Sequence, residues 1–220
     1  MILVYPDFDL EFDFEKSENY LLILENSKLF YKTSKMLYEQ TKGIDGDFVL
    51  SQDLNILNIS KTVEFIYDYY NIEINTKKVL TEINNQAIKI LRENDFIKQF
   101  SLLNENVNQI NQIIQQDIGF DIEYKYEFTF EDFVKFSDYK IVEDGSVLEL
   151  IETYLDFLKR INKSKIVIFV NIFNYFSKED IDLLIKDLNY KEFYILFLES
   201  KEKYKINATR YIIDEDLCLI

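Results

Sequence analysis

The chain has 220 residues and is acidic, with 40 Asp and Glu against 25 Lys and Arg, for a formal net charge of −15. It holds no histidine, one cysteine and four glycines. This composition excludes catalytic triads with histidine, His-ligated metal sites, intrachain disulfides and the usual Gly-rich phosphate-binding loops. The charge alone argues against nucleic acid and anionic membranes, but a local cationic lining or bound divalent cations would change that balance.

No apolar run approaches the ~18 residues that a membrane span needs. The N-terminal segment shows neither a basic leader nor a small-residue cleavage site. We therefore expect a cytoplasmic protein with no membrane partner.

The first 55 residues alternate predicted strands and helices. Acidic and apolar residues alternate from Asp7 to Glu15, which predicts a strand with one solvated face. The apolar run over residues 20–24 predicts a buried strand, a helix is expected from Ser27 to Gln40, and residues 48–50 indicate another short strand.

Residues from about 59 to 120 have the pattern of helices. The pair Asn75-Thr76 is a good N-cap signal, and apolar residues then recur at spacings of three and four over residues 79–90 and 103–114.

The last hundred residues return to alternation. The sequence predicts a short helix over 128–136, helices from Ser146 to Ile161 and from Ser177 to Asp187, and strands over 139–142, 165–170, 193–198 and 210–213. This order predicts an α/β fold. We expect a head with a mainly parallel sheet flanked by helices, formed by residues 1–58 and 138–220, and an inserted helical leg over residues 59–137.

Several segments carry a family resemblance. They are KIVIFVNIFNYFSKEDIDLL, FYILFLESKEKY and RYIIDEDLCLI near the C-terminus, YLLILENSKLFYKTSKMLYEQ near the N-terminus, and FDIEYKYEFTFEDFVKF in the middle. Together they resemble the Csn-two family of type II-A CRISPR systems, the DNA-end-binding ring proteins of spacer acquisition.

The resemblance implies an ATPase-like α/β head without a working nucleotide site, a helical leg, and no enzymatic activity. It also implies a homotetrameric ring with a basic hole, bound calcium ions, threading onto the ends of double-stranded DNA, and other CRISPR adaptation and effector proteins as partners.

The family's acidic stretch suggests Asp121, Glu123 and Glu127 as calcium ligands, because calcium takes six to eight hard oxygen atoms. Lys125 departs from the family pattern, which more often has an acid there. The alternative interpretation is a solvated acidic loop.

Candidate DNA-binding residues follow from helical geometry. Lys78, Lys89 and Arg92 fall on one helix face, opposite the apolar positions, where they would contact phosphates without reading sequence. Lys135 and Lys140 are added from rough alignment with basic positions of the family. The alternative is an ordinary solvated helix face.

Two other functions stay open at this stage. A nuclease would use the acidic clusters to hold divalent metal ions. A purely structural interaction protein would account for the negative charge and the helical insertion.

Overall fold

The computed structural model describes residues 1–120, 122–161 and 165–220, which form two compact units. Unit 1 comprises residues 1–72 and 144–220, and unit 2 comprises residues 73–143. Unit 2 is therefore an insertion in the chain of unit 1.

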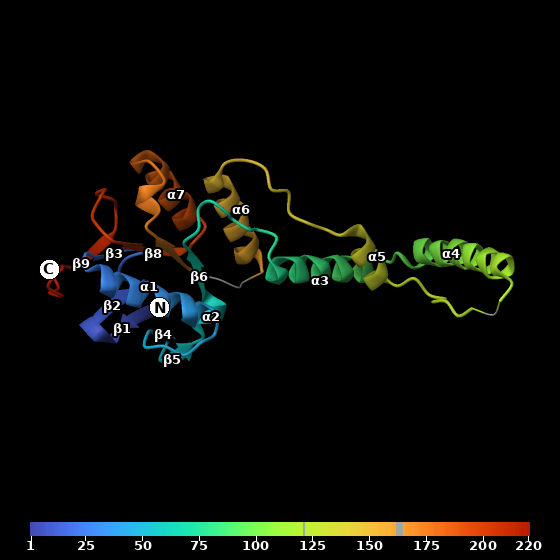
Figure 1. The fold of residues 1–220 in the computed structure, drawn as a ribbon, viewed down its shortest axis with the longest axis horizontal. Helices are drawn as coiled ribbons and strands as arrows, with labels where there is room; N and C mark the ends of the chain where they lie inside the picture. Colours follow the sequence, from blue (N-terminus) through green and yellow to red (C-terminus); the bar gives the residue numbers. More distant parts are fainter. Residues whose placement is uncertain (121, 162–164) are drawn as a thin grey trace. The chain divides into compact units, whose positions relative to one another are not determined.

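A five-stranded parallel sheet forms the centre of unit 1 (Figure 1). Its strands, in spatial order, are β6 (Val63–Ile66), β7 (Ile166–Val170), β8 (Tyr194–Glu199), β3 (Asn19–Leu24) and β9 (Thr209–Ile213). Every residue of β3 and β7 is buried. Such continuous apolar strands are stable only when both faces of the sheet are covered.

Helices cover both faces of this sheet. α6 (Val147–Arg160) and α7 (Lys178–Tyr190) lie on one side, and α1 (Ser27–Thr41) lies on the other (Figure 1). Ser146 and Ser177 begin α6 and α7 with capping boxes, in which the serine and an acid three residues later bond to each other's backbone N–H groups. The short α2 (Ile59–Thr62) and the 3-10 turn η2 (Ile172–Asn174) complete the connections.

A second, antiparallel sheet packs on the α1 side. Its order is β2 (Leu10–Asp13), β1 (Ile2–Tyr5), β4 (Val49–Gln52) and β5 (Asn55–Leu57), with the 3-10 turn η1 (Pro6–Phe8) between β1 and β2. Its buried side chains form one apolar core with α1 and with alternate residues of β3, β7 and β8. Both sheets therefore share a core within unit 1.

Unit 2 consists of α3 (Lys77–Glu93), α4 (Ile97–Ile118) and α5 (Phe130–Ser137). Among its described residues only Ile74, Val79 and Val134 are buried, and α4 has no buried residue at all. In the part of the chain that the structure describes, no helix is both long enough and apolar enough to cross a membrane.

The predicted α/β class is confirmed, and so are most of the individual helices and strands. The continuous strand expected over residues 7–15 is wrong. Pro6 and the left-handed Asp9 (φ 48°) turn the chain back, so that β2 pairs with β1.

Two further expectations are corrected. The helical pattern after residue 59 is interrupted by β6, which pairs with β7 in the parallel sheet. Residues 139–142 form no strand, because the side chain of Asn75 takes the place of a pairing strand. It accepts from Ile141 N (2.9 Å) and donates to Ile141 O (2.9 Å).

Candidate nucleic-acid interface

The predicted basic stripe lies on α3 in unit 2, which begins where Thr76 Oγ1 accepts from Val79 N at 3.3 Å. Lys89 and Arg92 are exposed and line one hollow of about 510 Å³, together with Asn85, Ile88, Glu93 and Glu131. Lys78 is half-buried and lies eleven residues before Lys89, about 16 Å along the helix axis. The structure therefore brings two of the three predicted cations of α3 into one site.

Three of the predicted DNA-binding residues, Arg92, Lys89 and Lys140, pair with described carboxylates of the same chain. Arg92 bonds to Glu131 at 2.7 Å, Lys89 lies 3.7 Å from Glu93, and Lys140 lies 2.6 Å from Asp138. Because all three pairs are solvent-exposed, water and competing anions can replace the carboxylates readily. Lys135, in the last turn of α5, is exposed and makes no ion pair with another described residue.

Glu131 is the residue of this hollow that the sequence analysis missed. It stands in the first turn of α5, where its own backbone N–H lowers the pKa of its carboxyl group and the bond to Arg92 lowers it further. The carboxylate is therefore a charged competitor for Arg92 at neutral pH. The capping-box pattern of Thr129 and Asp132 predicts the start of α5. No local sequence pattern predicts that Glu131 contacts a residue of α3.

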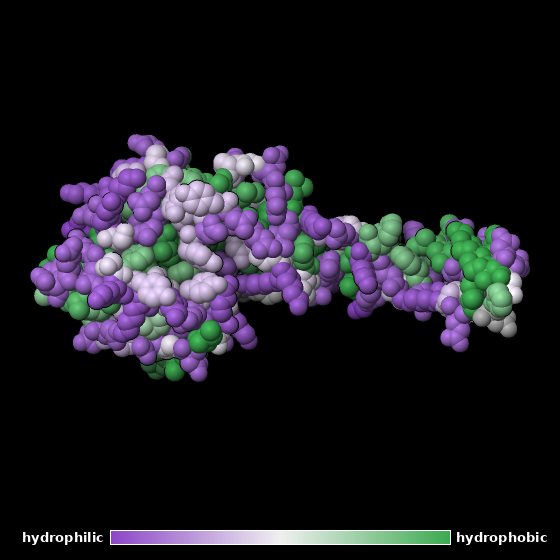
Figure 2. Space-filling view, viewed as in Figure 1, coloured by the Kyte–Doolittle hydropathy of each residue, from purple (hydrophilic) through white to green (hydrophobic). Residues whose placement is uncertain are grey.

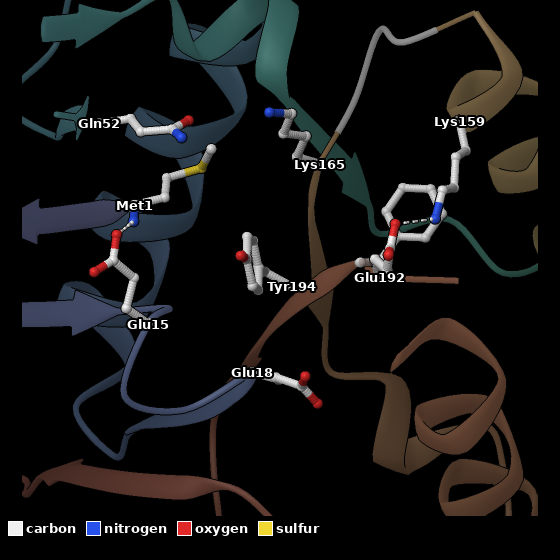
Figure 3. Close-up of a pocket in the computed structure, with 9 residues that line it drawn as sticks. Met1, Glu15, Glu18, Gln52, Lys159, Lys165, Glu192 and Tyr194 are labelled. Carbon is white, nitrogen blue, oxygen red and sulfur yellow. Dashed lines mark hydrogen bonds and ion pairs between the residues drawn. The ribbon is translucent and has the colours of Figure 1, made fainter. Parts of the chain in front are cut away.

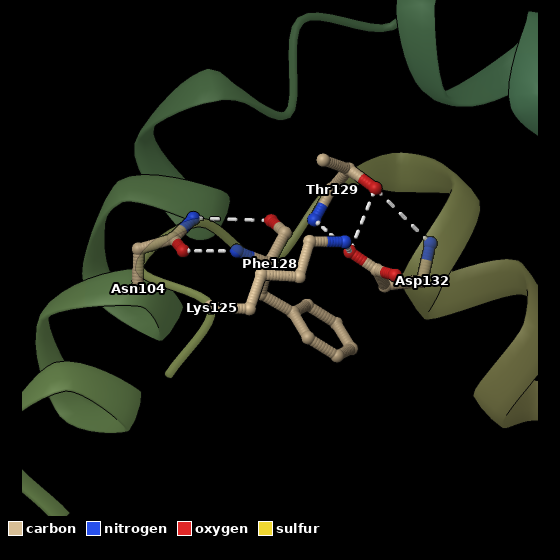
Figure 4. Close-up of polar contacts among 5 residues, drawn as sticks. All are labelled: Asn104, Lys125, Phe128, Thr129 and Asp132. Atoms are coloured by element: carbon tan, nitrogen blue, oxygen red, sulfur yellow. Dashed lines mark hydrogen bonds and ion pairs between the residues drawn. The ribbon is translucent and has the colours of Figure 1, made fainter. Parts of the chain in front are cut away.

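The acidic segment after α4 is anchored by side chains that its own pattern does not reveal (Figure 4). Asn104 of α4 accepts from Phe128 N (2.5 Å) and donates to Phe128 O (3.1 Å). Lys125 forms an ion pair with Asp132. The bond to Lys125, followed by the bonds to Thr129, lowers the pKa of Asp132 to about 2. Lys125, the departure from the family pattern, thus has a structural partner.

The predicted calcium ligands are placed only in part. Asp121 lies outside the described residues. Glu123 and Glu127 are exposed and form no hydrogen bond or ion pair with another described residue. Carboxylate oxygens are suitable donors for calcium. However, no three acidic side chains of the described residues gather into a group that would hold a metal ion.

The segments that carry the family resemblance in unit 1 meet at the carboxyl ends of β7 and β8. Asn171, in a left-handed conformation (φ 53°), accepts from Ser200 N at 3.0 Å. The carboxylate of Glu199, which is only 2% exposed, accepts from Phe173 N at 3.3 Å. Burial raises the pKa of Glu199 to about 8. These two side chains fasten η2 to the end of β8, which is a structural role.

A second hollow, of about 420 Å³, lies at the amino-terminal ends of β7 and β8 in unit 1 (Figure 3). Most of its charges pair with each other. The Met1 amino group bonds to Glu15 at 3.1 Å, and Lys159 bonds to Glu192 at 2.9 Å. Ligands of open α/β sheets bind at the opposite, carboxyl end of the strands. The α3 hollow is therefore the better candidate for binding a polyanion.

Comparison with known proteins agrees with these observations. The family model described as CRISPR-associated protein (Cas_Csn2) matches residues 40–217. The solved structure of Stu0660 of Streptococcus thermophilus has a similar fold, with a TM-score of 0.59 and 16% sequence identity, over 97% of this chain and 74% of that chain. The chain belongs to the Cas_Csn2 family of CRISPR-associated proteins.

Proposed function

We propose that the chain is a non-catalytic protein of CRISPR spacer acquisition that binds the ends of double-stranded DNA without reading sequence. In this proposal it acts as a calcium-stabilised homotetrameric ring. The observation that carries the proposal is the shared hollow of Lys89 and Arg92 on the exposed side of α3, in a chain of the Cas_Csn2 family.

Because the chain has a net charge of −15, it can bind DNA only where its cations are gathered on one surface, as a ring would allow. Phosphate contacts from Lys and Arg supply sequence-independent affinity, and counterion release makes that affinity fall with salt. A ring would place the α3 cations of several copies around one duplex and leave most acids outside. Closure around DNA would then add to individually weak contacts.

Unit 2 supports assembly because it cannot bury its own apolar surface. Six apolar side chains of α4 are exposed, namely Ile97, Leu102, Ile110, Ile113, Ile114 and Ile118. Figure 2 shows hydrophobic atoms gathered over the part that Figure 1 labels α4. Exposed apolar area on this scale is typical of surfaces that meet another protein, and soluble oligomers are mostly symmetric assemblies of identical chains.

The proposed calcium ligands are Glu123, Glu127 and Asp121. The ion would supply positive charge close in sequence to Lys135, the one basic residue of α5. In this proposal other copies of the chain supply the remaining ligands.

The decisive experiment compares linear with covalently closed circular duplex of equal length in a gel-shift assay, with calcium and then with a chelator. Threading requires an end, so only linear DNA should be retained. Equal binding of both forms would contradict the ring mechanism. The same gel run with magnesium or manganese tests the nuclease alternative, since cleavage that is lost in Asp121→Ala would favour it.

A charge reversal tests the site itself. Lys89→Glu with Arg92→Glu should abolish retention of linear DNA. Lys178→Glu with Lys186→Glu, which reverses two exposed lysines of α7 in unit 1 and changes the net charge by the same amount, is the matched control and should cost little. Equal losses would show that only total charge matters.

A further inference from the structure

The β4–β5 hairpin and the loop after α1 form an exposed apolar surface in unit 1. Leu54 is fully exposed, Ile56 is 81% exposed, and Ile44 and Val49 are also exposed. Ile44, Val49 and Ile56 line a hollow of about 260 Å³ with Phe48, Leu57 and Ile59. Figure 2 shows hydrophobic atoms at the margin where Figure 1 labels β5.

The tip of the hairpin has an unfavourable residue in an unfavourable conformation. Asp53 (φ 50°) and Leu54 (φ 64°) are both left-handed, a two-residue turn for which Asn-Gly or Asp-Gly is preferred. A leucine in this conformation, with its whole side chain in water, contributes nothing to the fold of unit 1. Such an outlier points to a role in contact with another molecule.

The loop beside the hairpin is rigidly held. Gln40 donates to Phe48 O (2.9 Å) and accepts from Phe48 N (3.2 Å), as a neighbouring strand would. A Cβ atom on Gly46 would lie 2.7 Å from the Gln40 side chain, so only glycine allows this close approach. Ile44 is thus presented in a fixed position, with its N–H bonded to Glu39 O at 3.0 Å.

β5 is an edge strand of the antiparallel sheet, so its outer backbone groups have no strand partner among the described residues. Edges that must stay unpaired are usually protected by proline, a bulge or a charge on the strand. β5 consists of Asn55, Ile56 and Leu57 and has none of these. An extended segment could therefore add to it through main-chain hydrogen bonds.

The rim of the apolar surface is acidic. Asp45, Asp47 and Asp53 are exposed and form no ion pair with any other described residue. The nearest lysine in the loop, Lys42, lies over the ring of Tyr38 at 5.2 Å. A second copy would bring the same acids face to face about a two-fold axis, and DNA or an anionic membrane would be repelled.

We propose that the β4–β5 hairpin and the loop over residues 42–48 dock an extended apolar segment, flanked by Lys or Arg, of a different protein, which adds as a strand to β5. The acids attract the basic flanks, and Leu54 and Ile56 contact the apolar centre. This docking site lies wholly in unit 1 and does not depend on DNA binding.

The probe is a blocked, fluorescein-labelled peptide, KKVTVTVKK, measured by fluorescence anisotropy against the full-length protein. We expect a Kd on the order of 100 μM or tighter, at least tenfold weaker binding of EEVTVTVEE, and a similar loss for KKVTPTVKK, whose proline cannot pair in a sheet. Absence of binding by KKVTVTVKK, or equal binding of the acidic peptide, would overturn the proposal.

Variants of the protein locate the site. Leu54→Ser with Ile56→Thr should weaken peptide binding at least tenfold, whereas Leu183→Ser, at a 65% exposed leucine on α7, should not. Neutralising Asp45, Asp47 and Asp53 to Asn should reduce both affinity and its dependence on salt.

Two readouts separate this proposal from the proposed function. The hairpin variant should keep the wild-type molar mass by light scattering and retain linear DNA as well as the wild type does. A change in molar mass would identify a second copy of the chain as the occupant of the hairpin surface. A loss of DNA retention would show that the hairpin surface takes part in DNA binding. Either result would overturn the docking proposal while leaving ring binding to be judged by its own assay.

Discussion

The two units of this protein solve the problem of burying apolar residues in opposite ways. Unit 1 completes its core within one chain, with β3 and β7 buried from end to end. Unit 2 buries only Ile74, Val79 and Val134 among its described residues and leaves six apolar side chains of α4 exposed. Helical stability comes mainly from packing of an apolar face. Unit 1 thus has a core of its own, while the described residues of unit 2 bury little apolar surface.

The largest effect should come from making the apolar side of α4 acidic. We expect Ile110→Asp with Ile113→Asp to lower the molar mass from that of the proposed tetramer to that of a smaller species, and to abolish retention of linear DNA, because buried charges oppose assembly. Light scattering measures the mass. Gln112→Asp, an exposed polar position on the same helix, is the control. An unchanged mass in the double variant would show that α4 makes no subunit contact.

Truncation of a core aromatic sharpens the contrast between the units. Phe169 of β7 is fully buried and its ring lies 5.7 Å from that of Phe197. Phe169→Ala should reduce the free energy of unfolding of unit 1 by about 3–5 kcal/mol. Ile90→Ala, at a 55% exposed position of α3 in unit 2 and outside the α4 side chains that we expect to meet another copy, should change it by less than about 0.5 kcal/mol. Urea denaturation followed by circular dichroism compares them, and similar costs would contradict the contrast.

The buried Glu199 should make the stability of unit 1 depend on pH. Its pKa is about 8 in the folded chain, above the ordinary value of 4.5, because burial disfavours the carboxylate. Between these values the folded state holds the proton that the unfolded state has lost. The stabilisation is therefore complete below about pH 4.5 and is lost as pH rises to 8, with a total on the order of 5 kcal/mol.

Glu199→Gln tests this directly, since an amide keeps the shape of the protonated acid and has no charge to lose. The variant should match the wild type near pH 5, exceed it near pH 8.5, and show a flatter profile in urea denaturation. Glu179→Gln, at an exposed position of α7, should keep the wild-type slope. Parallel profiles for Glu199→Gln and the wild type would mean that Glu199 does not titrate in this range.

Most helices and strands of unit 1 could be predicted from the sequence, because the strands are short and apolar and helix N-caps such as Ser146 and Ser177 are easily recognised. It failed where a tertiary partner overrides the local pattern. β6 became a strand because β7 lies beside it, and residues 139–142 lost their expected strand because Asn75 holds Ile141 instead.

The candidate site was foreseen to a similar extent. Helical periodicity alone places Lys89 and Arg92 on one face of α3, and the structure puts both in one hollow. The contact of Arg92 with Glu131 joins residues 39 positions apart, so no local pattern reveals it. The same holds for Asn104, which anchors Phe128 from another helix. The proposed calcium ligands cannot be judged in the same way, because a ligand set completed by other copies would have no signature within one chain beyond the acids themselves.

The smallest effect concerns the competition between Glu131 and phosphate for Arg92. Glu131→Gln removes a negative charge and the ion pair at 2.7 Å, so Arg92 is released for DNA. We expect linear duplex to bind about 2–5-fold more tightly in a salt titration, with a steeper dependence on salt because one more cation contacts phosphate. Glu179→Gln removes the same charge from unit 1 and should improve binding less. Weaker binding by Glu131→Gln would contradict the competition and would show that the ion pair positions Arg92 for its contact with DNA.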